Sequence, residues 1–169
     1  MGGKHSRLSP SKAHRWRKCP GSVRECAGYD DVSGAAAADG TNTHSMLQVC
    51  LLPENSHRNA LSFIGETITT TYRDEPPVSF VVDAARAERV QFCLDYIDKR
   101  CEHHFASYLS EQAVNPKFLT GRDDLDGTVD VLLVSRVLEI IDLKDGFGLV
   151  QPDCPQLEQY AFGAIDHLR

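Results

Sequence analysis

The stretch GTVDVLLVSRVLEIIDLK, residues 127–144, contains two apolar runs separated by a short polar break. The first run covers 127–134 and the second 137–144, with Ser135 and Arg136 between them. Both runs are rich in valine, leucine and isoleucine at successive positions, which is typical of strands in a sheet that helices cover on both faces. We therefore expect two paired, buried strands at the centre of the fold.

The register of this strand pair decides whether its two aspartates meet. A strict two-residue turn at Ser135-Arg136 places Asp130 and Asp142 on opposite faces of the sheet. A three-residue connection, or a single bulge, places the two aspartates directly across from each other on one face. In that register Lys144 shares their face and Glu139 falls on the other. The sequence leaves both registers open.

In the shared-face register the two aspartates have their Cα atoms roughly 5 Å apart. Two carboxylates that close require a cation or a shared proton. Mg²⁺ satisfies this demand with one or two carboxylates, retained waters and phosphate oxygens, and it lowers the pKa of a bound water. With Lys144 beside the pair to hold the attacking hydroxide or to neutralise charge, the chemistry indicated is hydrolysis of a phosphodiester.

The acid-x-base triplet Asp142-Leu143-Lys144 is weak on its own. With 24 acidic and 18 basic side chains in 169 positions, chance supplies about two or three such triplets. The alternative interpretation is a pair of surface carboxylates at the end of a sheet. The preceding Gly127-Thr128-Val129-Asp130 makes the catalytic interpretation stronger, but it does not settle it.

The remaining pattern, with two helices followed by strands and a final helix, predicts an α/β or an α+β protein; we expect the α/β class. Apolar spacing near 3.6 residues, with capping and breaking residues, predicts the helices. They are expected over 9–18 with Ser9 as N-cap, over 35–52, over 83–104, and from Asp153-Cys154-Pro155 almost to Arg169. Further strands are expected over 106–114 and within ETITTTY, residues 66–72.

Length and composition predict one globular domain spanning 1–169. At 169 residues and 41% hydrophobic, the chain can bury a core without help from disulfides or metals. The six cysteines are scattered with no C-x-x-C, which favours a reduced, cytoplasmic setting, and no apolar run is long enough for a membrane span. Zinc or calcium sites are poorly matched: Cys101, His103 and His104 lack a second ligand pair, and DDLDGTVD lacks the closing glutamate of a calcium loop.

Charge is unevenly distributed along the chain. The net charge is −6, yet residues 1–24 hold seven basic and no acidic side chains. The rest of the chain is −13, since it holds 11 basic and 24 acidic residues. This division suits a protein that meets a polyanion with one end and keeps carboxylates at another; the alternative is a solvated basic tail.

Five segments in order resemble a phage- and prophage-associated family in the RecB-like branch of the PD-(D/E)xK nuclease superfamily. They are LSPSKAHRWRKCPGSVR (8–24), AADGTNTH (37–44), GTVD (127–130), IIDLK (140–144) and QLEQYAFGA (156–164). The resemblance thus extends over most of the chain. It implies a restriction-endonuclease-like core with a mixed central sheet flanked by helices, here 35–169, preceded by the basic helix 9–18.

The resemblance also assigns roles to residues at matching positions. His44 is the expected metal-ligating histidine, Asp130 the first metal carboxylate and Asp142 the second. Lys144 is the expected catalytic lysine. The cofactor implied is Mg²⁺ or Mn²⁺.

Supporting roles follow for residues around this centre. Gln156 and Tyr160 match a Q-x-x-x-Y element, and their spacing of four places them on one helix face. Glu111, on the preceding strand, is a candidate supporting acid. The basic first helix is expected to contact DNA phosphates through Arg15, Arg17 and Lys18; its Trp16 is expected to be buried rather than stacked on a base.

The function implied is a metal-dependent deoxyribonuclease, exonucleolytic, in phage or mobile-element recombination. DNA and a recombination partner protein are the expected partners, in the cytoplasm of a bacterial host. Iron–sulfur ligation is not expected because the late cysteine triplet is missing. The chain stops directly after the Gln/Tyr helix, where the resemblance predicts further elements, so a fragment, a truncated gene product or a minimal version is expected. The alternative function is an inactive nuclease-fold module that binds DNA or a protein.

Overall fold

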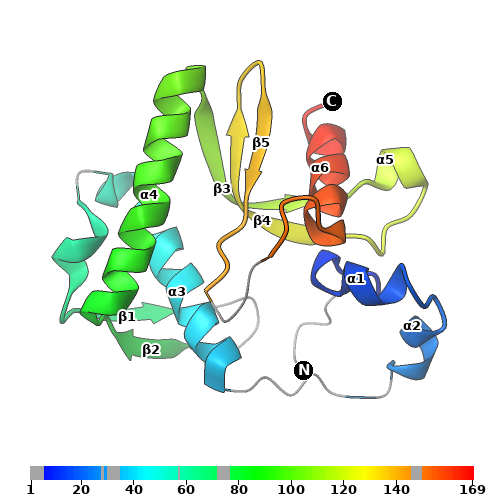
Figure 1. Cartoon of the computed structure of the whole chain (residues 1–169), viewed down its shortest axis with the longest axis horizontal. Coiled ribbons are helices and arrows are strands. Elements are labelled where there is room, and N and C mark those ends of the chain that lie inside the picture. The colour runs from blue at the N-terminus through cyan, green and yellow to red at the C-terminus, as the bar shows by residue number, and fades with distance from the viewer. Residues whose placement is uncertain (1–5, 28, 30–34, 57, 72–76, 146–149) are drawn as a thin grey trace.

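The computed structural model describes residues 6–27, 29, 35–56, 58–71, 77–145 and 150–169, and it confirms the α/β class (Figure 1). The helices are α1 (Ala13–Trp16), α2 (Ser22–Glu25), α3 (Ala35–Leu51), α4 (Ala84–His104), α5 (Lys117–Thr120) and α6 (Pro155–His167). The strands are β1 (Thr67–Thr70), β2 (Val78–Val81), β3 (Ser107–Val114), β4 (Gly127–Val134) and β5 (Leu138–Ile141). Short 3₁₀ turns cover Pro10–Lys12, Pro53–Asn55 and Ala60–Phe63. In the described part of the chain, no helix combines the length and the apolar character that crossing a membrane demands.

The described residues form two sheets, and both are antiparallel. The strands β3, β4 and β5 form a three-stranded meander, and β1 pairs with β2 in a separate hairpin (Figure 1). The prediction of a mixed central sheet is therefore wrong for the described residues, because every strand pair among them runs antiparallel. For β4 and β5 the short connection explains this: a parallel pair needs a crossover of a dozen or more residues, and only three residues join these two strands.

The β4–β5 hairpin adopts the shared-face register. Val131 pairs with Ile141 and Val134 with Leu138, so three residues connect the strands. Extending the same register by one step sets Asp142 opposite Asp130. The condition on which the candidate site depends is thus met.

Glu139 lies on the other face, as that register predicts. Its carboxylate accepts hydrogen bonds from the hydroxyl of Tyr96 at 2.8 Å and from Nε of Arg100 at 2.7 Å, both on α4. These contacts tie the hairpin to the long helix and keep Glu139 away from the aspartates.

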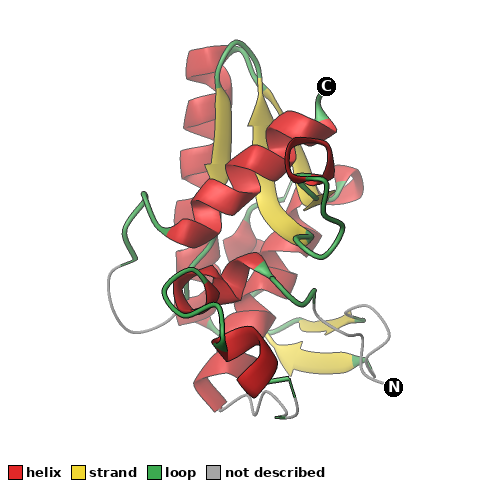
Figure 2. Ribbon diagram, turned by 90° about the vertical axis from the view of Figure 1, so that its right-hand side faces the viewer, coloured by secondary structure: helices red, strands yellow, loops and turns green. Residues whose placement is uncertain are grey.

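Two hydrophobic cores lie on opposite faces of the three-stranded sheet (Figures 1 and 2). Val131 and Leu133 of β4 face a core built with α3 and α4, whereas Leu132 faces a core built with α6. Alternate residues of β4 are therefore buried on both sides, which explains why its sequence is apolar at successive positions.

Helix α4 begins and ends where its sequence indicates. The carboxylate of Asp83 accepts a hydrogen bond from the backbone N–H of Arg86 at 2.8 Å and caps the first turn. Val90, Cys93 and Ile97 then bury one stripe of the helix. It ends at Phe105, whose left-handed backbone (φ 49°) stops the helical path.

The basic first helix is shorter and more broken than the predicted 9–18. It consists of the 3₁₀ turn and α1, and Ser9 makes no side-chain capping hydrogen bond. After the break at Cys19-Pro20-Gly21, the short α2 follows, which the sequence pattern did not predict.

This N-terminal segment is fixed to the body of the protein through α6 and β4. The Gln159 amide donates to the backbone oxygens of Leu8 at 2.9 Å and Leu125 at 2.8 Å. A Cβ at Gly127 would lie 2.5 Å from Cγ of Pro10 and 2.8 Å from Cε1 of Tyr160. Only glycine therefore permits this close approach of β4 to the 3₁₀ turn and α6.

Candidate functional site

The structure brings His44, Asp130, Asp142 and Lys144 together, although 100 residues separate the first from the last. His44 projects from α3, Asp130 lies within β4, and Asp142 directly follows β5. His44 Nδ1 lies 3.1 Å from Oδ2 of Asp130, and Lys144 Nζ lies 2.5 Å from Oδ2 of Asp142. The backbone N–H of Leu143 donates to Oδ2 of Asp130 at 2.7 Å, which fixes the end of β5 against β4.

Asp142 is the most covered member of the cluster. Its side chain is 5% exposed, against 13% for Asp130 and 40% for Lys144. Burial and the nearby charge of Asp130 raise the pKa of Asp142 above its ordinary value, although Lys144 and His44 oppose that rise. The second carboxylate is thus costly to keep ionised without a cation beside it.

His44 responds to the same carboxylates. Burial lowers the pKa of His44, but its hydrogen bond with Asp130 and the charges of Asp130 and Asp142 outweigh burial, and the pKa is raised overall. The contact uses Nδ1, so Nε2 is the ring nitrogen left for a ligand on the other edge of the imidazole.

Gln156 and Tyr160 reach the cluster from one face of α6, as their spacing predicts. The amide of Gln156 lies 3.3 Å from Oδ1 of Asp142 and 3.4 Å from the hydroxyl of Tyr160. Tyr160 is only 6% exposed and belongs to the core beneath α6. Gln156 is therefore the member of this pair that contacts a candidate catalytic carboxylate.

Glu111 lies on β3, the strand that pairs with the other edge of β4. Ser110 pairs with Val131 and Gln112 with Val129, so the register sets Glu111 across from Asp130. At this position Glu111 has a left-handed backbone with φ 49°. Such a conformation costs a non-glycine residue about 1–3 kcal/mol. The sheet is thus distorted at the rung that carries the aspartates.

The side chains of this cluster are of the kinds that bind a divalent cation. In the structure, however, both carboxylates are already engaged by neighbouring groups, an arrangement that we call closed. Two carboxylates and an imidazole suit Mg²⁺ or Mn²⁺. Within the described ranges, however, no three His, Cys, Asp or Glu side chains are arranged to hold a metal ion. Asp142 is engaged by Lys144, and Asp130 by His44 and Leu143. A cation held by both carboxylates would compete with the Lys144 ammonium.

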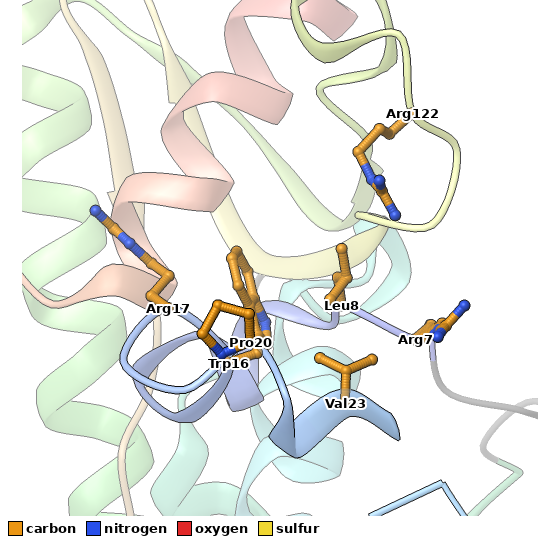
Figure 3. Close-up of a pocket in the computed structure, with 7 residues that line it drawn as sticks. All are labelled: Arg7, Leu8, Trp16, Arg17, Pro20, Val23 and Arg122. Carbon is orange, nitrogen blue, oxygen red and sulfur yellow. The ribbon is translucent and has the colours of Figure 1, made fainter. Parts of the chain in front are cut away.

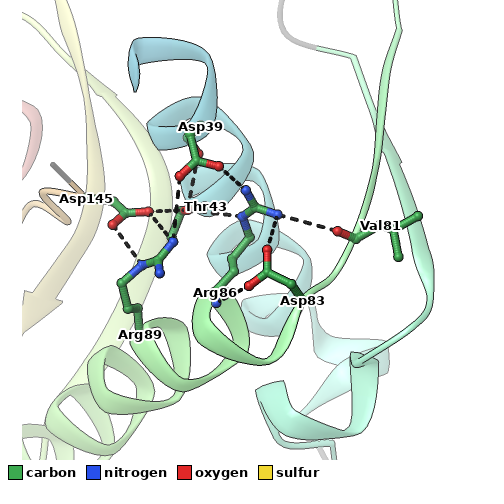
Figure 4. A network of polar contacts seen from close by, with 7 residues as sticks. All are labelled: Asp39, Thr43, Val81, Asp83, Arg86, Arg89 and Asp145. Carbon is green, nitrogen blue, oxygen red and sulfur yellow. Dashed lines mark hydrogen bonds and ion pairs between the residues drawn. The ribbon is translucent and has the colours of Figure 1, made fainter. Parts of the chain in front are cut away.

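A polar network that the sequence did not indicate lies beside the cluster (Figure 4). Arg86 of α4 is 5% exposed. Its guanidinium forms an ion pair with Asp39 of α3, lies 3.3 Å from a carboxylate oxygen of Asp83, and donates to Oγ1 of Thr43 at 3.3 Å. Arg86 thereby joins α3 to the start of α4.

The same network holds the residues next to His44 and Lys144. Thr43, fully buried, donates its hydroxyl proton to the carboxylate of Asp145. The same carboxylate forms an ion pair with Arg89 of α4, whose Nε lies 2.8 Å from Oδ1 of Asp145. Since Thr43 precedes His44 and Asp145 follows Lys144, the network fixes the backbone on both sides of the cluster. The sequence signal was slight: Arg86 and Arg89 at a spacing of three on one helix.

The three residues predicted to bind phosphates lie in α1 (Arg15) and directly after it (Arg17 and Lys18), and their surroundings differ. Arg15 and Lys18 are exposed, and neither has an ion pair among the described residues. Arg17 instead forms an ion pair with Glu158 of α6. Arg17 is therefore partly committed to holding α1 against the body of the protein.

Comparison with known proteins assigns the chain to a family. The family described as "Protein of unknown function (DUF2800)" matches residues 5–169, nearly the whole chain. The chain belongs to the DUF2800 family. The match covers all five segments that carry the resemblance noted in the sequence, but the description of DUF2800 names no activity, so nuclease chemistry gains no support from it. No solved structure matches the chain.

Proposed function

We propose that this protein is a metal-dependent DNA nuclease of the PD-(D/E)xK type, hydrolysing phosphodiester bonds. The observation that carries the proposal is the shared-face register of β4 and β5, which sets Asp142 opposite Asp130. Lys144 Nζ lies 2.5 Å from Asp142, and His44 Nδ1 lies 3.1 Å from Asp130. Two carboxylates and a lysine from the adjacent segments β4 and 142–144 are the residue types that support this proposal.

In the proposed reaction a water oxygen bonds to phosphorus, one P–O ester bond breaks, and the leaving oxygen takes up a proton. A divalent cation on Asp130 and Asp142 would supply an acidified water and counter the charge on phosphorus. Lys144 holds the attacking oxygen and neutralises charge as it develops. Asp130 orients His44 through Nδ1, and Gln156 restrains the carboxylate of Asp142.

DNA as the substrate is inferred from the basic N-terminal segment and from the resemblance to RecB-like nucleases. The exposed Arg15 and Lys18 suit phosphate contacts. The resemblance further supports exonucleolytic action in phage or mobile-element recombination, in the host cytoplasm and with a recombination partner protein. The restriction-endonuclease-like core is part of the same proposal.

Cleavage of linear DNA with Mg²⁺ or Mn²⁺ tests the proposal. We expect the wild type to cut, and Asp142→Asn and Lys144→Met each to lose about 100-fold or more in rate, because each removes a group that acts on the developing charge. Circular dichroism checks that the variants fold. Lys99→Met, at an exposed position on α4, is the matched control and should cut normally. Equal cleavage by the Asp142 and Lys144 variants would overturn the site assignment.

A second function is favoured by the closed arrangement of the carboxylates. Because Lys144 and His44 already occupy Asp142 and Asp130, an inactive member of the fold that only binds DNA or a protein would have this appearance. It predicts salt-dependent DNA binding with no cleavage under any divalent cation and no heat of metal binding in calorimetry. If the wild type binds metal in calorimetry and the Asp142→Asn variant does not, this second function is excluded.

A further inference from the structure

A second feature lies outside the carboxylate cluster, between α1, α2 and the loop that leads into β4. It is an open pocket of about 660 Å³. Three arginines line it, Arg7, Arg17 and Arg122, together with the indole of Trp16 (Figure 3). Apolar side chains make up the remainder. Its size lies within the range of small-molecule sites.

The arginines are held in place but not neutralised as a group. Arg122 makes a two-pronged contact with Asp124, with Nε at 2.8 Å and a terminal nitrogen at 2.6 Å. Arg17 pairs with Glu158. Arg7 is exposed and lies near enough to Asp124 that its charge, after that of Arg122, lowers the pKa of that carboxyl. Three guanidinium groups thus face two carboxylates, with Arg15 on the adjoining helix α1 and Lys18 in the turn after it.

Trp16 is anchored by one edge. Its Nε1–H donates to the backbone oxygen of Ser9 at 3.2 Å, and the side chain is half-buried. The indole is therefore fixed in orientation beside cationic groups. A flat apolar surface next to guanidinium groups matches a base attached to a phosphate.

We propose that this pocket binds a nucleotide unit of a single DNA strand, its phosphates at Arg7 and Arg122 and its base against Trp16. The proposal rests on the proposed function, since it deepens the assignment of DNA as substrate. Glu158, which holds Arg17, and Gln156, which contacts Asp142, are two apart on α6 and so do not face each other. The first turn of α6 therefore lies between the pocket and the carboxylate cluster, and a strand that reaches both must pass it.

The chain carries a single tryptophan, so its fluorescence reports on this pocket alone. The experiment titrates the full chain with a single-stranded oligothymidylate in EDTA, where no hydrolysis occurs. We expect the oligonucleotide to quench Trp16 emission, and an abasic strand of equal length to bind with much less quenching. Binding without any change in Trp16 emission would overturn the proposal.

Substitution of the arginines gives an independent readout through fluorescence anisotropy of a labelled strand. We expect the double variant Arg7→Gln/Arg122→Gln to raise Kd roughly tenfold at moderate salt, and to lower the slope of log K against log salt by about 1–1.5. Arg136→Gln is the matched control, because Arg136 is exposed in the loop between β4 and β5; its Kd should stay at the wild-type value. Equal affinity for the double variant and the control would contradict the proposal even if quenching occurred.

The outcomes separate this proposal from the nuclease proposal. Wild-type affinity in the double variant, together with metal-dependent cleavage by the wild type, removes the pocket assignment and leaves the nuclease standing. Loss of affinity with no cleavage removes the nuclease and leaves the pocket. Equal quenching by poly-glutamate of the same charge, or no binding of single-stranded DNA at all, overturns the nucleotide assignment.

Discussion

Asp83 shows how one exposed residue sets the beginning of the longest helix. Its carboxylate accepts the hydrogen bond from the Arg86 N–H that no backbone carbonyl can reach at the start of α4. The residue was part of the expected helix 83–104, and the structure assigns it the N-cap position. Because α4 lies beside both the polar network and the first core, the cap contributes to the placement of each.

We expect Asp83→Ala to lower the free energy of unfolding by about 1 kcal/mol at pH 7. The backbone hydrogen bond from Arg86 is the main reason that the pKa of Asp83 lies below the ordinary value of 3.8 for an aspartate. The stabilisation is therefore present above pH 3.8 and is lost as the pH falls through the lowered folded-state pKa. Urea denaturation at pH 7 and at acid pH measures it.

The control for this prediction is Asp83→Asn, which keeps an acceptor but does not titrate. It should remain close to the wild type at pH 7 and should show no acid-dependent loss of the cap. A stability difference between wild type and Asp83→Ala that persists unchanged in acid would show that the carboxylate charge is not responsible.

At the scale of elements, α3, α4 and the chain after β5 are joined by charge rather than by apolar packing alone. Arg86 connects Asp39 on α3 with Asp83 at the start of α4, and Asp145 connects Thr43 with Arg89. These contacts fix the segments that carry the candidate catalytic groups. Burying Arg86 requires them, since an unpaired charge in its position would be strongly unfavourable.

We expect Arg86→Met to lower the free energy of unfolding by about 1–3 kcal/mol. The loss is moderate because the Asp39 and Asp83 side chains are 54% and 59% exposed, so water can replace the guanidinium. Chemical denaturation measures it, with Arg136→Met as the control that should change stability by less than about 0.5 kcal/mol. If the two variants are equally stable, the network is not structural.

At the scale of the whole molecule, β4 contributes fully buried residues to both cores. Leu132 and Leu133 are neighbours in β4, 0% and 1% exposed, and they face opposite sides of the sheet. The first core contains α3 and α4, and the second contains α6. Because both cores need β4 in place, disruption of one core should also disrupt the other. Unfolding should therefore be cooperative.

We expect Leu132→Ala and Leu133→Ala each to cost about 2–5 kcal/mol and to shift two probes together. Trp16 fluorescence reports on the side of α6, whereas far-UV circular dichroism reports on all helices, including the long α4. Leu61→Ala, at a side chain that is 44% exposed, serves as the control and should have a small effect. A Leu133→Ala variant whose circular dichroism shifts while its Trp16 transition stays in place would show two independent units.

The sequence by itself determined the helices over 35–52 and 83–104, the strands at 106–114 and 127–134, and the α/β class. These features depend on the local spacing of apolar residues, which is set by the period of each element. The motifs likewise sufficed to nominate His44, Asp142 and Lys144. Whether they meet remained open, because two- and three-residue turns were equally compatible with the chain.

Only the tertiary structure decided the register that pairs Val131 with Ile141 and so brings the aspartates together. It also replaced the expected mixed sheet by an antiparallel one, committed Arg17 to Glu158, and revealed the contacts of Arg86. The physical reason is common to all of these. Register, ion pairs between distant segments and buried charge depend on which surfaces face each other after the chain closes its loops, and local periodicity carries no information about that closure.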